Sequence, residues 1–265
     1  MIDSKTDLYC IFGNPVEHSK SPAMHNAWFE YYKINAVYTA FKINNIALAI
    51  KAMKILNIKG ASITIPFKES VMEYLDHIDE NALNIGAVNT IINKDGKLSG
   101  FNTDFKAAIE PLKPFGIKNK KVCILGAGGA AQAVAHGINK NQGDLVIINR
   151  SIQRGRQLAL KYNAKFIAMH EIKQMKKFKA DILINTTPIG MYPETTREAS
   201  PFPSHLLDHK MVVMDIIYNP LNTRLLSSAK NKGCTIINGL SMFMHQGAAQ
   251  FKLWTGITPL NMDQS

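Results

Sequence analysis

The sequence predicts an α/β protein of two domains with a cleft between them. Short apolar runs alternate with longer amphipathic runs along the 265 residues, which is the rhythm of strands joined by crossover helices. The rhythm stops in a stretch rich in proline and lysine, residues 110–121, and then restarts. A chain of this length also commonly divides into two domains. We therefore expect a domain junction near residues 101–118.

The expected elements follow from the spacing of the apolar residues. Short runs with branched or aromatic side chains are expected to be strands, and longer runs with helical periodicity are expected to be helices. The first series covers residues 9–12, 23–34, 37–41, 46–56, 61–65 and 88–92. The second series covers residues 122–125, 132–138, 145–148, 157–160, 182–184, 211–216 and 235–237. Because crossover helices connect parallel strands, both sheets are expected to be parallel.

Composition favours a folded protein of the cytoplasm. Hydrophobic residues make up 46% of the sequence and charged residues 19%, which is ordinary for globular proteins. The first residues lack the pattern of an export signal, and no stretch approaches the roughly 20 apolar residues of a membrane span. Cys10, Cys123 and Cys234 lie far apart in apolar runs, so we expect buried thiols without a disulfide or a metal site.

The net charge of +11 points to anionic ligands. A basic protein can also bind nucleic acid, but here the basic residues are scattered and no recognisable reading motif is present. The densest basic run, which contains Lys173, Lys176, Lys177 and Lys179, is expected to be a solvated helix face. Small anionic molecules are therefore the expected partners, whereas nucleic acid and membranes are not.

A glycine-rich turn between an expected strand and an expected helix indicates a dinucleotide. The segment Gly126-Ala-Gly-Gly-Ala-Ala131 fits GxGxxA, in which the glycines permit a tight turn and close approach of a pyrophosphate to the backbone. The helix amides then face the phosphates. The second domain is therefore expected to be of the Rossmann type, although a chance glycine-rich turn is the alternative. The expected contacts are Gly126, Ala127, Gly128, Gly129 and Ala130.

The end of the next expected strand favours NADP over NAD. An NAD enzyme places Asp or Glu there to bind the ribose 2′-hydroxyl, whereas this chain has Asn149 and Arg150. A guanidinium holds a 2′-phosphate through charge-assisted hydrogen bonds, and Ser151 and Arg154 are near enough in sequence to help. The alternative is that both arginines are ordinary surface residues of a first helical turn.

Polar residues of the first half are candidates for binding an anionic substrate. Ser21 followed by Pro22 is typical of a helix cap, and that helix end, beside Ser19, could hold a carboxylate. Lys68 follows an expected strand and could donate a proton, and Asp104 lies in an expected first helical turn. Each also has a plain interpretation, as a helix cap, a solvated lysine and a first-turn acid.

Taken together, these segments resemble the shikimate dehydrogenase family. The matching motifs run in order from GNPVEHSKSPAMHN through TIPFK, GAVNT, GFNTD, GAGGAA, NRS, NTTPIGM and DIIYNP to NGLSMFMHQ. Each motif is weak, but their order across almost the whole chain argues against chance. The resemblance implies an NADP-dependent oxidoreductase that reversibly reduces 3-dehydroshikimate to shikimate, on the way to chorismate and the aromatic amino acids. It also implies a substrate-binding catalytic domain of residues 1–101 plus 240–265 and an NADP-binding domain of residues 102–239.

The resemblance further implies roles for individual residues. Lys68 and Asp104 become the catalytic pair, because hydride arriving at a ketone carbon develops an alkoxide that needs a proton donor and positive charge. The residues implied to bind the substrate are Ser19, Ser21, Thr64, Lys68, Asn89, Asp104, Tyr218 and Gln246. Those implied to contact the cofactor at later strand ends are Thr187, Ile216 and Gly239. Without the resemblance, such strand ends are more often ordinary exits than cofactor contacts.

The chain departs from the family's pattern at two positions. Ser62 stands where the family usually has Asn, and Ala107 replaces a common glycine. Ser62 is shorter and cannot form the same amide hydrogen bonds, which leaves open the substrate affinity and the choice between shikimate and a relative. Ala107 is expected to affect only helix packing.

Two other functions and the oligomeric state stay open from the sequence. One alternative is a dehydrogenase that also accepts quinate. The other is an NADP-binding regulatory protein without turnover, against which the retained Lys68, Asp104 and Gln246 argue. A homodimer is compatible with the sequence, which does not decide the number of subunits.

Overall fold

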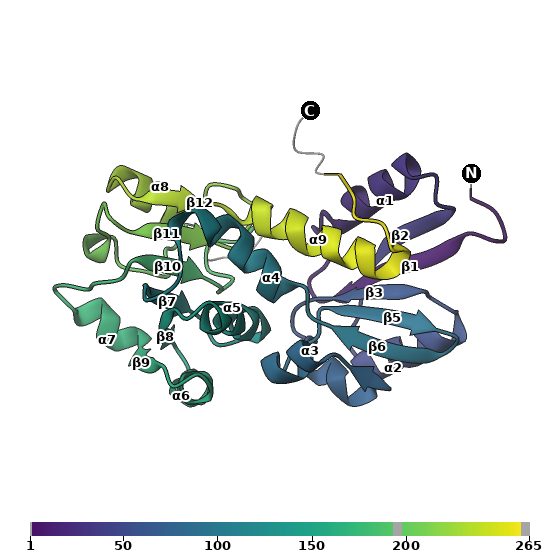
Figure 1. The fold of residues 1–265 in the computed structure, drawn as a ribbon, viewed down its shortest axis with the longest axis horizontal. Helices are drawn as coiled ribbons and strands as arrows, with labels where there is room; N and C mark the ends of the chain where they lie inside the picture. The colour runs from purple at the N-terminus through teal and green to yellow at the C-terminus, as the bar shows by residue number, and fades with distance from the viewer. Residues whose placement is uncertain (1, 193–197, 261–265) are drawn as a thin grey trace. The chain divides into compact units, whose positions relative to one another are not determined.

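The computed structural model describes residues 2–192 and 198–260 and divides into two compact units (Figure 1). Unit 1 consists of Met1–Thr103 with Gln246–Ser265, and unit 2 consists of Asp104–His245. The chain therefore leaves unit 1 after Thr103 and returns after His245, within the last helix, α9 (Gly239–Thr255). Unit 1 is thus completed by segments far apart in the sequence.

Unit 1 is built on a six-stranded sheet in the order β2-β1-β3-β5-β6-β4. Its strands are β1 (Asp7–Gly13), β2 (Ala36–Lys42), β3 (Gly60–Ile63), β4 (His77–Ile78), β5 (Thr90–Lys94) and β6 (Lys97–Phe101). Besides the second part of α9, its helices are α1 (Ser21–Tyr31), α2 (Ile46–Ile55), the 3-10 helix η1 (Ser70–Tyr74) and α3 (Glu80–Ile85).

The expectation that the first sheet is parallel is wrong. β1 pairs in parallel with β2 and β3, but β5 is antiparallel to both β3 and β6. β5 and β6 form a hairpin around Asp95 and Gly96, whose φ angles of 53° and 84° are the left-handed values of a type I′ turn. The Asp-Gly pair between two apolar runs is the sequence signal for this hairpin, and apolar periodicity alone does not detect it.

Two apolar layers hold unit 1 together, one on each face of its sheet. On one face, α2, η1 and α3 pack on the strands through a cluster that includes Met53, Val71 and Ile91. On the other face, the Tyr9 ring of β1 lies 5.2 Å from the rings of Phe29 in α1 and Trp254 in α9. Alternate residues of a strand face opposite sides, so each strand serves both layers.

His25 lies in the aromatic layer and is fully buried. Its ring stacks on that of Tyr38 with centroids 4.6 Å apart, and neither ring nitrogen has a hydrogen-bond partner among the described residues. Burial lowers the pKa of His25 to about 3, and the nearby Gln250 side chain opposes this in part. The folded protein therefore holds this histidine neutral.

We expect the free energy of unfolding to fall as the pH drops from 6.5 toward 3. The unfolded chain protonates His25 below pH 6.5 and the folded protein only near pH 3, so acid favours the unfolded state by up to about 1.4 kcal/mol per pH unit in this window. A His25→Phe variant should lose this contribution and show a shallower decline. Urea denaturation of both proteins across the window measures the difference, and equal slopes would contradict the assignment.

Unit 2 is a six-stranded parallel sheet with the strand order of the Rossmann fold. The order is β12-β11-β10-β7-β8-β9 with every pair parallel, which corresponds to 3-2-1-4-5-6 when numbered within the unit. The strands are β7 (Lys121–Leu125), β8 (Asp144–Asn149), β9 (Lys165–Ala168), β10 (Ile182–Asn185), β11 (Val212–Asp215) and β12 (Thr235–Ile237). The two-domain α/β class and the Rossmann-type second domain are confirmed.

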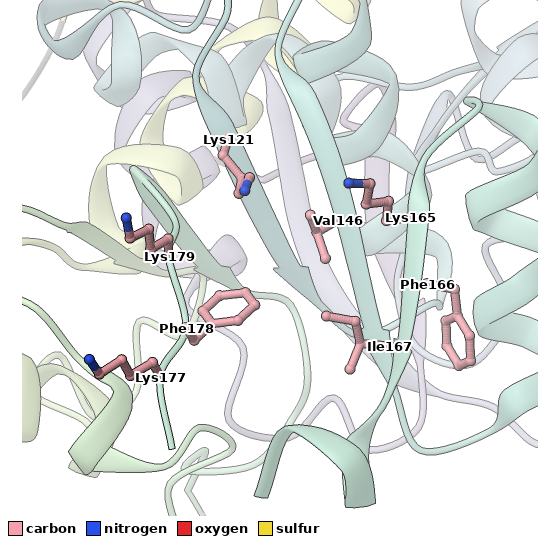
Figure 2. Close-up of a pocket in the computed structure, with 8 residues that line it drawn as sticks. All are labelled: Lys121, Val146, Lys165, Phe166, Ile167, Lys177, Phe178 and Lys179. Carbon is pink, nitrogen blue, oxygen red and sulfur yellow. The ribbon is translucent and has the colours of Figure 1, made fainter. Parts of the chain in front are cut away.

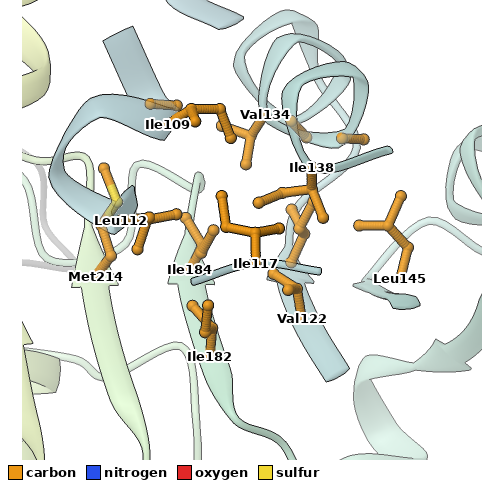
Figure 3. Packing of buried hydrophobic residues seen from close by; sticks show 14 of the residues in the cluster. Ile109, Leu112, Ile117, Val122, Val134, Ile138, Leu145, Ile182, Ile184 and Met214 are labelled. Carbon is orange, nitrogen blue, oxygen red and sulfur yellow. The ribbon is translucent and has the colours of Figure 1, made fainter. Parts of the chain in front are cut away.

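The helices of unit 2 cover both faces of this sheet. Besides the first part of α9, they are α4 (Asp104–Ile109), η2 (Glu110–Phe115), α5 (Gly129–Lys140), α6 (Ile152–Lys161), α7 (Met169–Gln174), η3 (Ser204–Leu206) and α8 (Arg224–Asn231). One face packs against α4, η2, α5 and α6 through residues such as Val122 and Ile184 (Figure 3). The other packs against α7, η3 and α8 through Cys123 and Leu183. Ala107, the second departure from the family pattern, is buried in the first of these cores.

The described part of the chain contains all three cysteines of the sequence. All three cysteines there are free and buried, as expected. In the same part, no group of three or more His, Cys, Asp or Glu side chains could hold a metal ion. No helix among the described residues is both long enough and apolar enough to cross a membrane.

Candidate functional site

The glycine turn lies where β7 ends and α5 begins, at the carboxyl edge of the parallel sheet of unit 2. Gly126 has a φ of +115°, which residues with a side chain rarely adopt, and a Cβ there would lie 2.5 Å from Thr186 Oγ1. The Thr186 hydroxyl donates to the Leu125 carbonyl oxygen over 2.6 Å. Glycine at position 126 therefore lets the segment after β10 pack on the turn.

The second glycine leaves the amino end of α5 open. Gly128 is the N-cap residue, it is exposed, and no atom beyond its own chain neighbours lies within 4 Å of the place a Cβ would take. No side chain caps this helix, so the amides of its first turn can face a ligand. A pyrophosphate fits such a place, because the backbone N–H groups and the helix dipole both favour an anion.

The basic residues expected to select NADP follow directly after β8. β8 lies beside β7, and the Gly126 N–H donates to the Ile148 carbonyl oxygen over 2.8 Å, so the two strand ends are neighbours. The Asn149 side-chain amide donates to the Ser151 carbonyl oxygen over 2.9 Å. Ser151 caps α6, with its hydroxyl oxygen accepting from the backbone N–H of Arg154.

Arg150 therefore directly follows a strand end that is fixed next to the glycine turn. Arg150 is exposed, and the strand ends without a carboxylate that would repel a 2′-phosphate. The open amides of α5 and the basic end of β8 together fit a dinucleotide that carries an extra phosphate on its ribose.

A buried carboxylate that the sequence analysis missed fixes the ends of β10 and β11. Asp215 accepts hydrogen bonds from Thr223 Oγ1 at 2.7 Å, Asn185 Nδ2 at 3.0 Å and the Ile217 N–H at 3.1 Å. Burial is the larger effect and raises the pKa of Asp215 to about 6, although these three donors oppose the rise. No periodicity signal distinguishes such a buried polar residue from the apolar residues around it.

This network holds residues that are predicted to contact the cofactor. Asn185 Oδ1 accepts from the Thr187 N–H at 3.0 Å and from the Thr187 hydroxyl at 2.7 Å. The Ile216 N–H donates to the Asn185 carbonyl oxygen over 3.1 Å. A Cβ on Gly239 would lie 2.3 Å from the Ile216 carbonyl oxygen, so glycine lets the start of α9 approach the end of β11. The Tyr218 ring packs 4.5 Å from that of Phe243 in α9.

In unit 1, the two serines predicted to hold a carboxylate lie together at the amino end of α1. The Ser21 N–H donates to Ser19 Oγ over 3.2 Å. The predicted cap is wrong by one residue, because Lys20 is the N-cap and Ser21 and Pro22 are the first two helical residues. Lys20 makes no side-chain cap hydrogen bond, and Ser19 Oγ accepts from the first N–H group of the helix, so both serines lie at this helix end.

Thr64 and Lys68 lie in the turn that follows β3. β1 and β3 run in parallel and end side by side, and the Thr64 N–H donates to the Phe12 carbonyl oxygen over 3.0 Å. The Lys68 carbonyl oxygen accepts from the Val88 N–H over 2.8 Å. The first bond joins the TIPFK segment to the end of β1, and the second joins it to the GAVNT segment.

Asn89 is bound to the residue that precedes Asp104. Asn89 Oδ1 accepts from the Thr103 N–H, and Asn89 Nδ2 donates to Thr103 Oγ1, both over 2.9 Å. Asp104 is buried, begins α4 and is the first residue of unit 2. Gln246, on α9, is the first residue of the segment that returns to unit 1. Two predicted site residues thus mark the places where the chain passes between the units.

A cavity of about 390 Å³ lies at the opposite edge of the unit 2 sheet (Figure 2). Lys121 and Lys165, which line it, are the first residues of β7 and β9, so the cavity is at the amino ends of strands, whereas dinucleotides bind at the carboxyl ends. Lys177 and Lys179 also line it. Both follow α7, which ends at Gln174. The expected helix face is therefore wrong for Lys176, Lys177 and Lys179, and only Lys173 of that run lies in a helix.

Family models match three parts of the chain. The shikimate dehydrogenase substrate binding domain matches residues 11–91, the shikimate / quinate 5-dehydrogenase model matches residues 110–222, and the shikimate 5′-dehydrogenase C-terminal domain matches residues 239–260. A curated shikimate dehydrogenase (NADP(+)) of Methanocaldococcus jannaschii is 45% identical over an alignment of 271 positions, which spans 98% of this chain and 95% of that protein. The chain belongs to the shikimate dehydrogenase family.

Solved structures of the shikimate dehydrogenase family share this fold. One, described as a shikimate dehydrogenase in complex with NADP+, aligns with a TM-score of 0.90 and 43% identity over 98% of this chain and 93% of its own. Another, from Thermus thermophilus in complex with NADP(H) and shikimate, aligns with a TM-score of 0.86 and 34% identity over 96% and 95%. The resemblance inferred from the sequence motifs is therefore confirmed.

Proposed function

We propose that this protein is an NADP-dependent shikimate dehydrogenase, which reversibly reduces 3-dehydroshikimate to shikimate on the way to chorismate and the aromatic amino acids. The observation that carries the proposal is membership of the family over almost the entire chain, with Lys68 and Asp104 both present. NADP is the cofactor in the names of its relatives, and the open amides of α5 beside Arg150 support the same choice.

In this proposal the first domain, residues 1–101 plus 240–265, binds the substrate, and the second, residues 102–239, binds NADP(H). The hydroxyls of Ser19 and Ser21, at the amino end of α1, hold the substrate carboxylate. The residues proposed to hold the ring hydroxyls are Thr64, Asn89 and Gln246, with Tyr218 beside the ring. NADP(H), when bound, supplies or accepts the hydride.

Lys68 is the proposed acid of the reduction. As hydride reaches the ketone carbon, negative charge develops on the carbonyl oxygen, and a nearby ammonium stabilises that charge. The Lys68 ammonium donates a proton to this oxygen and then regains one from water. Asp104 accepts hydrogen bonds from the ammonium and from the substrate hydroxyl, which orients both. In the oxidation direction, neutral Lys68 accepts the hydroxyl proton.

The proposal is tested by incubating the purified protein with NADP+ and shikimate, and separately with NADP+ and quinate, and following NADPH absorbance. Turnover with shikimate is the expected result. Quinate stays a second candidate because the model that matches residues 110–222 describes both activities. Turnover with quinate alone would show that quinate, and not shikimate, is the substrate. Binding of NADP+ without turnover of either compound would favour a regulatory role.

An Arg150→Ala variant is expected to lose preference for NADP+. Its guanidinium is proposed to form charge-assisted hydrogen bonds to the 2′-phosphate, and their loss should raise the KM for NADP+ about 10- to 100-fold. The KM for NAD+, which lacks that phosphate, should change little. Arg156→Ala, at an exposed position of α6, is the matched control. A parallel rise in both KM values would show that Arg150 does not recognise the phosphate.

A further inference from the structure

A chain of hydrogen bonds runs through the interior of unit 1 from β2 to β5. The Tyr38 hydroxyl donates to Ser62 Oγ over 2.6 Å, and the Ser62 hydroxyl donates to Gln250 Oε1 over 3.0 Å. Gln250 Nε2 donates to Thr90 Oγ1 over 3.0 Å and to the Asn89 carbonyl oxygen over 3.1 Å. All five residues are buried, so the Gln250 amide connects α9 to β3 and to the start of β5 within the core.

The chain of bonds continues to the residue before Asp104. The Thr90 hydroxyl donates to Asn89 Oδ1 over 2.7 Å. The Asn89 amide then forms its two bonds to Thr103, one to the backbone N–H and one to the hydroxyl oxygen. Gln250 is therefore connected, through Thr90 and Asn89, to the point where the chain leaves unit 1.

The side-chain amides of Gln250 and Asn89 can each be oriented in only one way, because each has a partner that can only accept or only donate a hydrogen bond. The backbone carbonyl oxygen of Asn89 can only accept a hydrogen bond, so Gln250 Nε2 must face it. Gln250 Oε1 then faces Ser62. The Thr103 N–H can only donate, so the oxygen of Asn89 must face it. The hydroxyls of Ser62 and Thr90 each accept one hydrogen bond and donate the next, an arrangement in which neighbouring bonds strengthen one another.

We propose that Gln250 is a positioning residue that supplies from α9 the buried amide that Ser62 is too short to supply from β3. Because Ser62 Oγ and Gln250 Oε1 are 3.0 Å apart, an asparagine at position 62 would place its own amide where the Gln250 amide lies. Ser62 and Thr90 are opposite each other on the paired strands β3 and β5, and the Gln250 amide bridges them from α9. An amide on residue 62 would reach the same partners from β3. Through Asn89 and Thr103 this amide positions a substrate-binding residue and Asp104, so the inference rests on the proposed function.

The first test removes the amide but keeps the length of the side chain. A Gln250→Met variant should lower kcat/KM for shikimate about 10- to 100-fold, because Ser62, Thr90 and the Asn89 backbone lose a buried partner and Asn89 is less well held. The Kd for NADP+ should stay within about twofold, because Gln250 belongs to unit 1 and the proposed NADP residues to unit 2. Gln174→Met, at the exposed last residue of α7, is the matched control. An unchanged kcat/KM in Gln250→Met would overturn the proposal.

The second test asks whether the amide can be moved to the other strand. Ser62→Asn alone should lower kcat/KM, because two amides then compete for one place, and Gln250→Ala alone should lower it because none is present. The double variant, Ser62→Asn with Gln250→Ala, should recover to within about threefold of the wild type, a coupling that independent structural damage does not produce. Losses that simply multiply in the double variant would overturn the exchange of roles.

A third measurement does not depend on turnover. Hydrogen exchange of the Thr103 backbone amide, followed by NMR, should be about tenfold faster in Gln250→Met, because its acceptor Asn89 is less well held. The Ile217 amide, which donates to Asp215 in unit 2, should exchange at an unchanged rate. Unchanged exchange at Thr103 would overturn the network. If the wild type oxidises neither shikimate nor quinate, the proposed function fails, and the exchange rates still decide whether Gln250 holds Thr103.

Discussion

A Lys68→Ala variant is expected to bind NADP+ normally and to lose about 10²–10⁴-fold in kcat for shikimate oxidation. The loss follows from removing the group that exchanges the hydroxyl proton and stabilises charge on the oxygen. The substitution keeps the hydrogen bond that the Lys68 carbonyl oxygen accepts from the Val88 N–H, so the fold should be retained.

Steady-state kinetics and NADP+ titration of the purified variant check this result. Lys51→Ala, at an exposed position of α2, is the matched control and should have normal kcat. Added ethylamine should restore part of the activity of Lys68→Ala, because a small amine can occupy the vacated space and carry the proton. Near-normal turnover of Lys68→Ala without added amine would remove this residue from the mechanism.

An Asp104→Asn variant is expected to lose about 10²–10⁴-fold in kcat/KM for shikimate. The asparagine keeps the size of the side chain but has no charge to orient the Lys68 ammonium. Asp104 begins α4, so a loss of the favourable first-turn charge must be separated from a loss of catalysis. Glu80→Gln, an exposed first-turn acid of α3, provides that control and should leave kcat/KM unchanged.

Combining the two substitutions tests whether these residues act as a unit. Groups that depend on each other are strongly non-additive, so the double variant should lose little more than the worse single variant. Losses that multiply would show that Lys68 and Asp104 act independently. The same kinetic assay serves for all four proteins, including the wild type.

The Rossmann half could be predicted from the sequence because its strands are buried on both faces. Residues 122–125 of β7 and 145–148 of β8 are therefore continuous apolar runs. The glycine pattern that follows β7 is typical of a dinucleotide-binding turn. The short edge strand β9 is not among the expected strands, because its exposed Lys165 leaves an apolar run of only Phe166, Ile167 and Ala168.

Unit 1 was predicted less well because two of its features depend on pairing rather than on periodicity. The antiparallel β5–β6 hairpin is encoded by Asp95-Gly96, two residues that periodicity counts as a break. The two-residue strand β4 is defined by its pairing with β6, which no local pattern indicates.

The candidate site divides in the same way. The glycine turn and Arg150 follow from residue type and spacing. Lys68 has only a weak signal, its place after an expected strand, and Asn89 was identified through the family resemblance. Their roles stay predictions. Asp215 and Gln250 were not identified, because a buried polar side chain is recognised by its partners, and those partners come from strands that are distant in the sequence.

Because unit 1 is made of two separate segments of the chain, it constrains the order in which the protein folds during translation. The rings of Phe251 and Trp254, on the last helix, cover Trp28 and Tyr9 near the beginning of the chain. While the ribosome is still making the middle of the protein, that aromatic surface is exposed to water or to chaperones. Unit 2 is contiguous, so its sheet can form before α9 is complete. The aromatic layer of unit 1 can form only after α9 has been made.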